Sequence, residues 1–239
     1  MPTSTDGKSA TDPLSIVLLQ ADGCDKAAKI LQYTLRYLHY IVPKYGSLSK
    51  FDDQRLQRAI KSMSSSRKII RLAKCIYSWP AILDSRPTLQ PIGLANFINN
   101  WIGNFNDILD DIAYLGGFGF FSKSLTRFAE VWADRVWFSS CFFDIFVLVV
   151  QLHYLQKEIA VVQSAKYDSG EGSIRVNEIR KLNTKRAMCC IGLLKMFGDV
   201  GIASTYACHL NTSKGNIALF GLLSASAGIY KLYAKAKQT

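Results

Sequence analysis

The chain has 239 residues, a formal net charge of +11 and an isoelectric point near 9.4. This charge predicts an anionic partner, and a hydrophobic content of 49% with a mean hydropathy of +0.09 favours anionic membrane lipids over nucleic acid. The aromatic residues lie within apolar runs and do not alternate with basic residues, as they would in a nucleic-acid stacking platform.

The residue types that carry catalysis and metal binding are scattered along the chain. The six cysteines include no CxxC pair, which predicts free thiols in a reducing compartment, and the three histidines are isolated from one another. No nucleophile with a base, metal cluster or cofactor motif stands out. We therefore expect a protein that is not an enzyme and that uses no cofactor or metal.

The first part of the chain predicts amphipathic helices. Residues 1–11 are polar and predict a disordered tail. Asp12 followed by Pro13 is typical of a helix start, and apolar residues then recur at helical spacing as far as residue 155. We therefore predict an amphipathic helical region over residues 12–155.

Within this region, residues 50–79 predict one basic amphipathic helix. Its apolar arc is formed by Leu56, Ile60, Met63 and Ile70. The cations expected to contact lipid head groups are Arg58, Lys61, Arg67, Lys68 and Arg71. Because Arg67 and Lys74 fall within the apolar arc, either a side chain must snorkel or the helix must bend. We interpret this stretch as a membrane-inserting helix; the alternative is a surface helix of a soluble bundle with a solvated basic face.

Three neighbouring carboxylates, Asp107, Asp110 and Asp111, follow on the next helical stretch. One interpretation is functional: acid–base chemistry or a cation site. The other is structural: a solvated patch or a counterface for the basic helix. No histidine or nucleophile accompanies them, so we favour the patch or counterface.

The last part of the chain predicts a membrane hairpin. Residues 156–186 are polar and predict a linker, and residues 187–239 contain two apolar segments and a basic tail. Small residues occupy one side of the second segment at helical spacing: Gly221, Ser224, Ala225 and Gly228. Such a stripe lets two helices approach closely in a membrane, although a closely packed soluble helix would have the same pattern.

The distribution of charge predicts the topology of this hairpin. The segment before it and the tail after it are basic, whereas the loop 209–215 has one lysine, so the positive-inside rule places both chain termini in the cytosol. A third span at 137–155 would put one basic flank on the wrong side. We therefore interpret that stretch as interfacial or packed in protein, and predict an all-α fold: amphipathic helices in a cytosol-facing bundle, followed by a C-terminal transmembrane helical hairpin.

A compact motif near the start of the chain consists of Asp25, Lys26, Gln32, Tyr33 and Arg36. It resembles the N-terminal DKxxRxLQYxxR signature of the peroxin-11 family, and further short motifs resemble this family in family order across nearly the whole chain. Further matches are Ser66 to Lys68, Arg71-Leu72, Asp110 to Tyr114, Ala133 to Arg135, Trp137, Lys195, Asp199, Gly221, Ser224, Gly228 and Tyr230. The chain departs from the family pattern at Cys24, where an arginine is usual, and at Asp111, where an asparagine is usual. The segment 156–186 matches no family motif.

The resemblance implies a membrane protein of peroxisomes or of the related glycosomes. Such a protein would face the cytosol, self-associate, elongate the membrane and help recruit the dynamin-type fission machinery and its membrane adaptor. The leading hypothesis is therefore a non-enzymatic remodelling factor that inserts a basic amphipathic helix. The alternative is a pore or solute-transfer protein in which Lys195, Asp199 and Asp144 line a polar path.

The C-terminus carries Lys235 and Lys237, three and five positions from the end of the sequence. This spacing matches the dilysine signal that coatomer binds, so coatomer is a hypothetical partner. A basic tail that flanks a membrane helix explains the same two residues.

Overall fold

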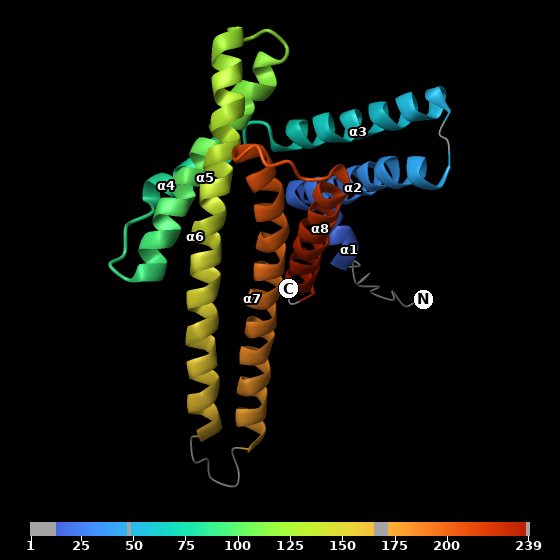
Figure 1. Ribbon diagram of the computed structural model, residues 1–239. Helices are drawn as coiled ribbons and strands as arrows, with labels where there is room; N and C mark the ends of the chain where they lie inside the picture. Colours follow the sequence, from blue (N-terminus) through green and yellow to red (C-terminus); the bar gives the residue numbers. More distant parts are fainter. Residues whose placement is uncertain (1–12, 47–48, 165–171, 238–239) are drawn as a thin grey trace, which may run out of the picture.

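The computed structural model describes residues 13–46, 49–164 and 172–237, and within them the chain forms eight α-helices and no strand (Figure 1). The helices are α1 (Pro13–Leu18), α2 (Ala21–Tyr45), α3 (Lys50–Arg71), α4 (Lys74–Asp84), α5 (Pro91–Gly116), α6 (Lys123–Ser164), α7 (Gly172–Ala207) and α8 (Lys214–Ala236). The all-α prediction is confirmed. The predicted tail, 1–11, lies outside the described residues.

Helices α6 and α7 form a long antiparallel hairpin that sets the length of the molecule (Figure 1). At 1.5 Å per residue the two helices are roughly 63 Å and 54 Å long, about twice the hydrocarbon thickness of a bilayer. Most of the predicted linker over 156–186 is helical, because α6 continues to Ser164 and α7 begins at Gly172. Its residues are polar, but pairing of the two helices keeps them helical.

Among the residues that the structure describes, three helices are long and apolar enough to cross a membrane: α6, α7 and α8. Both segments of the predicted hairpin are among them. The third, α6, contains the stretch 137–155 that the charge distribution assigned to the interface or the protein interior. Measured over an 18-residue window, α6 is the most apolar of the three, although Asp144 interrupts it.

The predicted basic helix is not continuous. Helix α3 ends at Arg71, Ala73 adopts a left-handed conformation with a φ of 60°, and α4 begins at Lys74. A non-glycine residue in this conformation costs about 1 kcal/mol or more. The Ala73 N–H donates a hydrogen bond of 3.0 Å to Asp111, which offsets part of that cost. Of the two alternatives for Lys74, a snorkelling side chain or a bend, the structure shows a complete break just before it, with Ala73 bonded to a carboxylate 38 residues away.

Helix α8 packs between α7 and α2. Gly198 of α7 lies against the Phe220 carbonyl of α8, where an added Cβ would come within 2.6 Å of the oxygen. On the other side, Lys26, Tyr33 and Tyr40 of α2 face successive small residues of α8 in reverse order. Helices α2 and α8 therefore run antiparallel over most of their length, and α3 lies along the outer side of α2 (Figure 1).

Candidate functional site: a buried charged junction of four helices

A buried cluster of polar and charged side chains joins α2, α3, α7 and α8. We call it the charged junction; its members are Asp25, Lys29, Gln32, Arg67, Asp199 and Ser224. Asp25, Lys29, Gln32, Asp199 and Ser224 are nearly inaccessible to solvent. Most of these residues belong to motifs that were separate in the sequence.

One half of the junction is centred on the Asp199 carboxylate. Lys29 donates to one carboxylate oxygen at 2.9 Å, and Lys195 donates to the other at 2.9 Å. The Ser224 hydroxyl donates to Asp199 and accepts from Lys29 at 2.8 Å. Both oxygens of Asp199 are therefore engaged, and this half of the junction ties α2, α7 and α8 together.

The other half is centred on the Asp25 carboxylate. The Arg67 guanidinium donates to Asp25 at 3.0 Å and to the Gln32 side-chain oxygen at 2.8 Å. Lys26 donates to Asp25 at 2.9 Å, and Arg71 lies 3.8 Å away. Burial alone would raise the pKa of Asp25, but the neighbouring positive charges of Lys26 and Arg67 outweigh it and lower the pKa to about 2. Asp25 is therefore ionised at neutral pH and holds the end of α3 on α2.

The small-residue stripe of α8 is the surface on which α2 rests. A Cβ atom at Gly221 would overlap the Tyr33 ring, and one at Gly228 would lie 3.2 Å from the Lys26 side chain. Ala225 is fully buried in the same row. The close approach of the two helices lets the Lys29 ammonium reach both Ser224 and Asp199. The predicted packing role of the stripe fits this contact, with α2 as the partner helix.

The remaining family-motif residue on α2, Arg36, stacks over the Tyr33 ring at 5.1 Å from its centroid. The motif residues of α2 thus lie along the surfaces that face α3 and α8. Asp25 and Gln32 contact α3, whereas Lys26 and Tyr33 contact α8, so the sequence alone could place these residues only on one helix. The long-range partners Arg67 and Asp199 decide their role.

The predicted insertion face of α3 lies outside the charged junction. Its four apolar residues, Leu56, Ile60, Met63 and Ile70, are partly buried, whereas Arg58, Lys61 and Lys68 are exposed. We expected Arg67 and Arg71 to contact lipid head groups. In the structure both side chains instead lie toward Asp25. The remaining three cations are free of that constraint and stay available to an anionic surface.

The acidic cluster on α5 is the counterface for the end of the basic stretch. Lys74 lies 3.6 Å from Asp107, Arg71 lies 3.7 Å from Asp110, and Asp111 caps α4 through Ala73. Burial raises the pKa of both Asp107 and Asp110 despite these cations. Over the described residues no group of three His, Cys, Asp or Glu side chains is placed to hold a metal ion. The contacts with Lys74, Arg71 and Ala73 fit the counterface interpretation of this cluster.

Lys235 and Lys237 lie at the end of α8, away from the charged junction. The sequence also gave no warning of a pocket between α6 and α7, because its residues come from both helices of a hairpin and from the start of α5. The signal for this pocket in the sequence was the run of basic residues at 180–186, which lies within the predicted linker.

Within the described residues, three apolar helices have membrane-crossing length, and buried ion pairs on α2 connect one of them, α7, to the basic amphipathic helix α3. This is the arrangement of an α-helical membrane protein. The family model of peroxisomal biogenesis factor 11 (PEX11) matches residues 12–233, and the chain belongs to this family. It is thus associated with the peroxisomal membrane and has the family's role in peroxisome proliferation and membrane elongation. No curated protein and no solved structure matches the chain.

Proposed function

We propose that the chain elongates the peroxisomal membrane by inserting the apolar face of α3 into the cytosolic leaflet. Helix α3 combines this face with exposed cations and is attached to the candidate membrane spans through the charged junction. A helix inserted at shallow depth expands one leaflet relative to the other, which favours curvature.

The packing of α3 supports a helix that is held at both ends and loosely in the middle. The Arg67–Asp25 ion pair and the acidic counterface hold its C-terminal end, and the 2.8 Å contact between His39 and Asp53 holds its first turn on α2. Its middle borders a cavity of about 410 Å³, lined by Ile60 and Lys61 of α3 and by Arg36 of α2 among others. Loose packing lowers the cost of moving the apolar face from protein to lipid, and this cavity is the observation that carries the proposal.

Both electrostatic and apolar terms contribute to insertion. Each of Arg58, Lys61 and Lys68 adds roughly 1 kcal/mol near an anionic membrane. Each large apolar side chain adds roughly 1.5–3 kcal/mol if burial is complete, and less at an interface. Binding should therefore weaken with salt and also when the apolar face alone is disrupted.

The test uses the full chain reconstituted with vesicles that contain anionic lipid. Ile60→Glu should reduce tubulation several-fold and give fewer, rounder peroxisomes in cells. Gln54→Glu adds the same charge on an exposed position of α3 and should have little effect. If Ile60→Glu leaves tubulation intact while neutralising Arg58, Lys61 and Lys68 abolishes it, α3 is an electrostatic tether and the insertion mechanism is wrong.

We further propose that the chain self-associates and helps recruit dynamin-type fission machinery through its membrane adaptor, as the family resemblance implies. Differently tagged copies should co-purify from detergent, and the adaptor should co-purify with them. Coatomer binding through Lys235 and Lys237 is a separate hypothesis. A coatomer pull-down that is unchanged when both lysines become serine would eliminate it.

The solute-path alternative relies on Lys195, Asp199 and Asp144. The first two are ion-paired to each other within the charged junction, and Asp144 accepts a hydrogen bond of 2.7 Å from Asn99 of α5. These contacts favour helix packing over an open path. Conductance in a planar bilayer that disappears when Lys195 and Asp199 are neutralised together would reverse this preference.

A further inference from the structure

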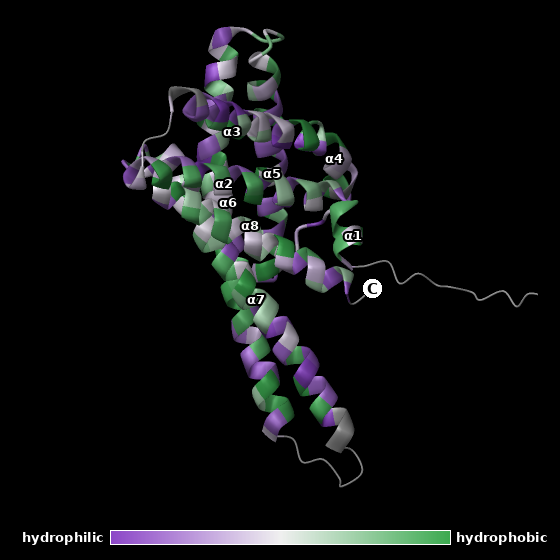
Figure 2. Cartoon of the chain, turned by 90° about the vertical axis from the view of Figure 1, so that its right-hand side faces the viewer, coloured by the Kyte–Doolittle hydropathy of each residue, from purple (hydrophilic) through white to green (hydrophobic). Residues whose placement is uncertain are grey.

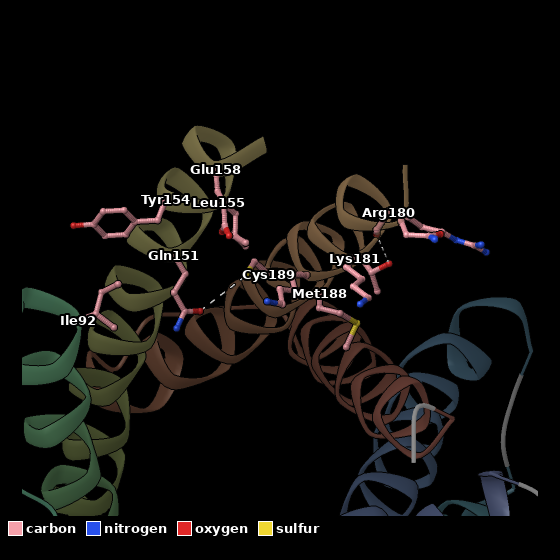
Figure 3. A pocket seen from close by; sticks show the side chains of 12 residues that line it. Ile92, Gln151, Tyr154, Leu155, Glu158, Arg180, Lys181, Met188 and Cys189 are labelled. Atoms are coloured by element: carbon pink, nitrogen blue, oxygen red, sulfur yellow. Dashed lines mark hydrogen bonds between the residues drawn. The ribbon is translucent and has the colours of Figure 1, made fainter. Parts of the chain in front are cut away.

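A pocket of about 880 Å³ opens between α6 and α7, close to the first turn of α5 (Figure 3). Three cations from α7 line it: Arg180, Lys181 and Lys185. The opposing carboxylate is Glu158 of α6. All four side chains belong to exposed residues, so the mouth of the pocket carries an excess of positive charge that is accessible from outside. Such a mouth is complementary to a phosphate group.

The inner part of the same pocket is apolar. Leu155, Met188 and Ile92 line it, and Tyr154 points from α6 toward α5 (Figure 3). Ile92 and Tyr154 also line an adjoining cavity of about 420 Å³. A single ligand that fills both cavities would need a charged head and an apolar tail.

The apolar part continues along α5 and α6. The adjoining cavity shares Pro91 with a third cavity of about 430 Å³, which Leu94, Phe142 and Phe146 line. Those three side chains are about half exposed, at 44%, 53% and 46%. Three neighbouring cavities with shared lining residues therefore lie in a row from the basic mouth toward the middle of the apolar part of α6.

The position of the mouth fits the boundary of a bilayer. On α7 the basic residues 180–186 give way to an apolar run that begins at Ala187, and on α6 the apolar run gives way to polar residues at Gln156. Figure 2 shows the same change, with many hydrophilic residues in the far part of the α6–α7 hairpin. If α7 crosses a membrane with α6 packed along it, the mouth lies at head-group level and the apolar cavities lie toward the hydrocarbon.

We propose that this pocket binds an anionic phospholipid, with its phosphate at Lys181 and Lys185, which lie one turn apart on α7, with Arg180 at the rim, and with one acyl chain along the cavities toward Phe142. The site shares no lining residue with the cavity beside α3. A bound lipid would fix the spacing of α6 and α7 and the start of α5. The inference therefore does not depend on insertion of α3, and each can fail without the other.

The test measures phosphatidic acid binding to the purified full chain in a non-ionic detergent by native mass spectrometry. Changing the three cations together to glutamine should weaken binding about tenfold or more, since each contributes near an anionic group. The matched control is Lys123→Gln, Lys157→Gln and Arg186→Gln, three exposed cations outside the pocket lining, and should change binding by less than about threefold. Equal losses in the two triple variants would overturn the proposal.

A second variant tests the acyl chain and does not alter charge. Leu155→Trp fills the apolar part, so it should remove the advantage of long-chain over short-chain phosphatidic acid while circular dichroism stays unchanged. Phosphatidylcholine should bind much more weakly than phosphatidic acid to the unaltered chain. Competition by inorganic phosphate as effective as that of long-chain lipid would assign the site to a soluble anion and reject a lipid ligand.

Discussion

Single residues decide how the helices are joined. Asp25 and Asp199 are buried carboxylates, and each is surrounded by cations from other parts of the chain. A buried ion pair adds little net stability compared with apolar packing, but removing one partner leaves a buried charge without compensation. The charged junction is therefore expected to specify which helices pack together, and to be sensitive to the loss of any one member.

Asp25→Asn should destabilise the fold by roughly 2–4 kcal/mol, because it leaves Arg67 buried beside a neutral group. The measurement is thermal unfolding of the full chain in detergent. The control is Asp110→Asn, whose side chain is 40% exposed and lies 3.7 Å from Arg71; it should change stability by less than about 1 kcal/mol. Equal effects would show that the Asp25 contact does not hold α3 in place.

The low pKa of Asp25 also predicts a pH dependence. The folded pKa of about 2 lies below the ordinary value of 3.8, so the carboxylate stabilises the fold above pH 3.8 and loses this contribution as pH falls through 2. The contribution is about 2 kcal/mol. The difference in unfolding midpoint between the unaltered chain and Asp25→Asn should be constant from pH 7 to 5 and shrink towards pH 2.5. A difference that widens on acidification would contradict the assignment.

At the scale of helices, the two contacts that α2 makes, with α8 and with α3, differ in how closely the helices pack. Large side chains of α2 rest on small residues of α8, whereas α3 contacts α2 around a cavity. The first contact is therefore tight and the second loose. This difference agrees with a fixed α2–α8 pair and a movable α3.

Two glycines of the small-residue stripe provide a matched comparison. Gly221→Ala places a methyl group in the Tyr33 ring and should cost roughly 1–3 kcal/mol by overpacking. Gly228→Ala meets only the flexible Lys26 side chain, at 3.2 Å, and should be neutral or stabilising by up to about 1 kcal/mol because alanine favours a helix. Thermal unfolding in detergent distinguishes them. Similar values for both variants would mean that α2 does not rest on α8.

At the scale of the whole molecule, α2 lies at the same level as α8. Tyr40 packs on Gly215 at one end and Lys26 on Gly228 at the other. If α8 crosses the membrane, this part of α2 is at membrane depth, where an unpaired charge is costly. The ion pairs of Lys29 and Asp25 satisfy that requirement. The structure thus links the N-terminal motif to the C-terminal hairpin far more closely than a separate cytosolic bundle would.

Protease protection on intact peroxisomes tests the membrane topology. With α7 and α8 as the two spans, tags at both termini should be removed from the cytosolic side, because both basic flanks of the hairpin stay there. A tag inserted in the loop 209–213 should be protected. Removal of the C-terminal tag with protection of the N-terminal tag would instead indicate that α6 is a third span.

Much of the helical architecture could be predicted from the sequence, because helical periodicity and apolar length are local properties. The two segments of the C-terminal hairpin and the apolar arc of α3 are examples. The break at Ala73 could not be predicted, because the carboxylate of Asp111 that accepts its N–H lies on another helix. The helical conformation of most of 156–186 was missed for the same reason, since the polar residues of α6 and α7 are held by each other.

The sequence by itself determined an all-helical, basic membrane protein with the motifs of its family in order. Only the tertiary structure decided what those motifs do. Asp25, Arg67 and Asp199 lie in three distant segments, and their signs and spacing along the chain do not state which cation belongs to which carboxylate. Packing decides which charges pair. The small residues of α8 let α2 approach closely enough for the buried charges to meet, and burial leaves these charges no other partner.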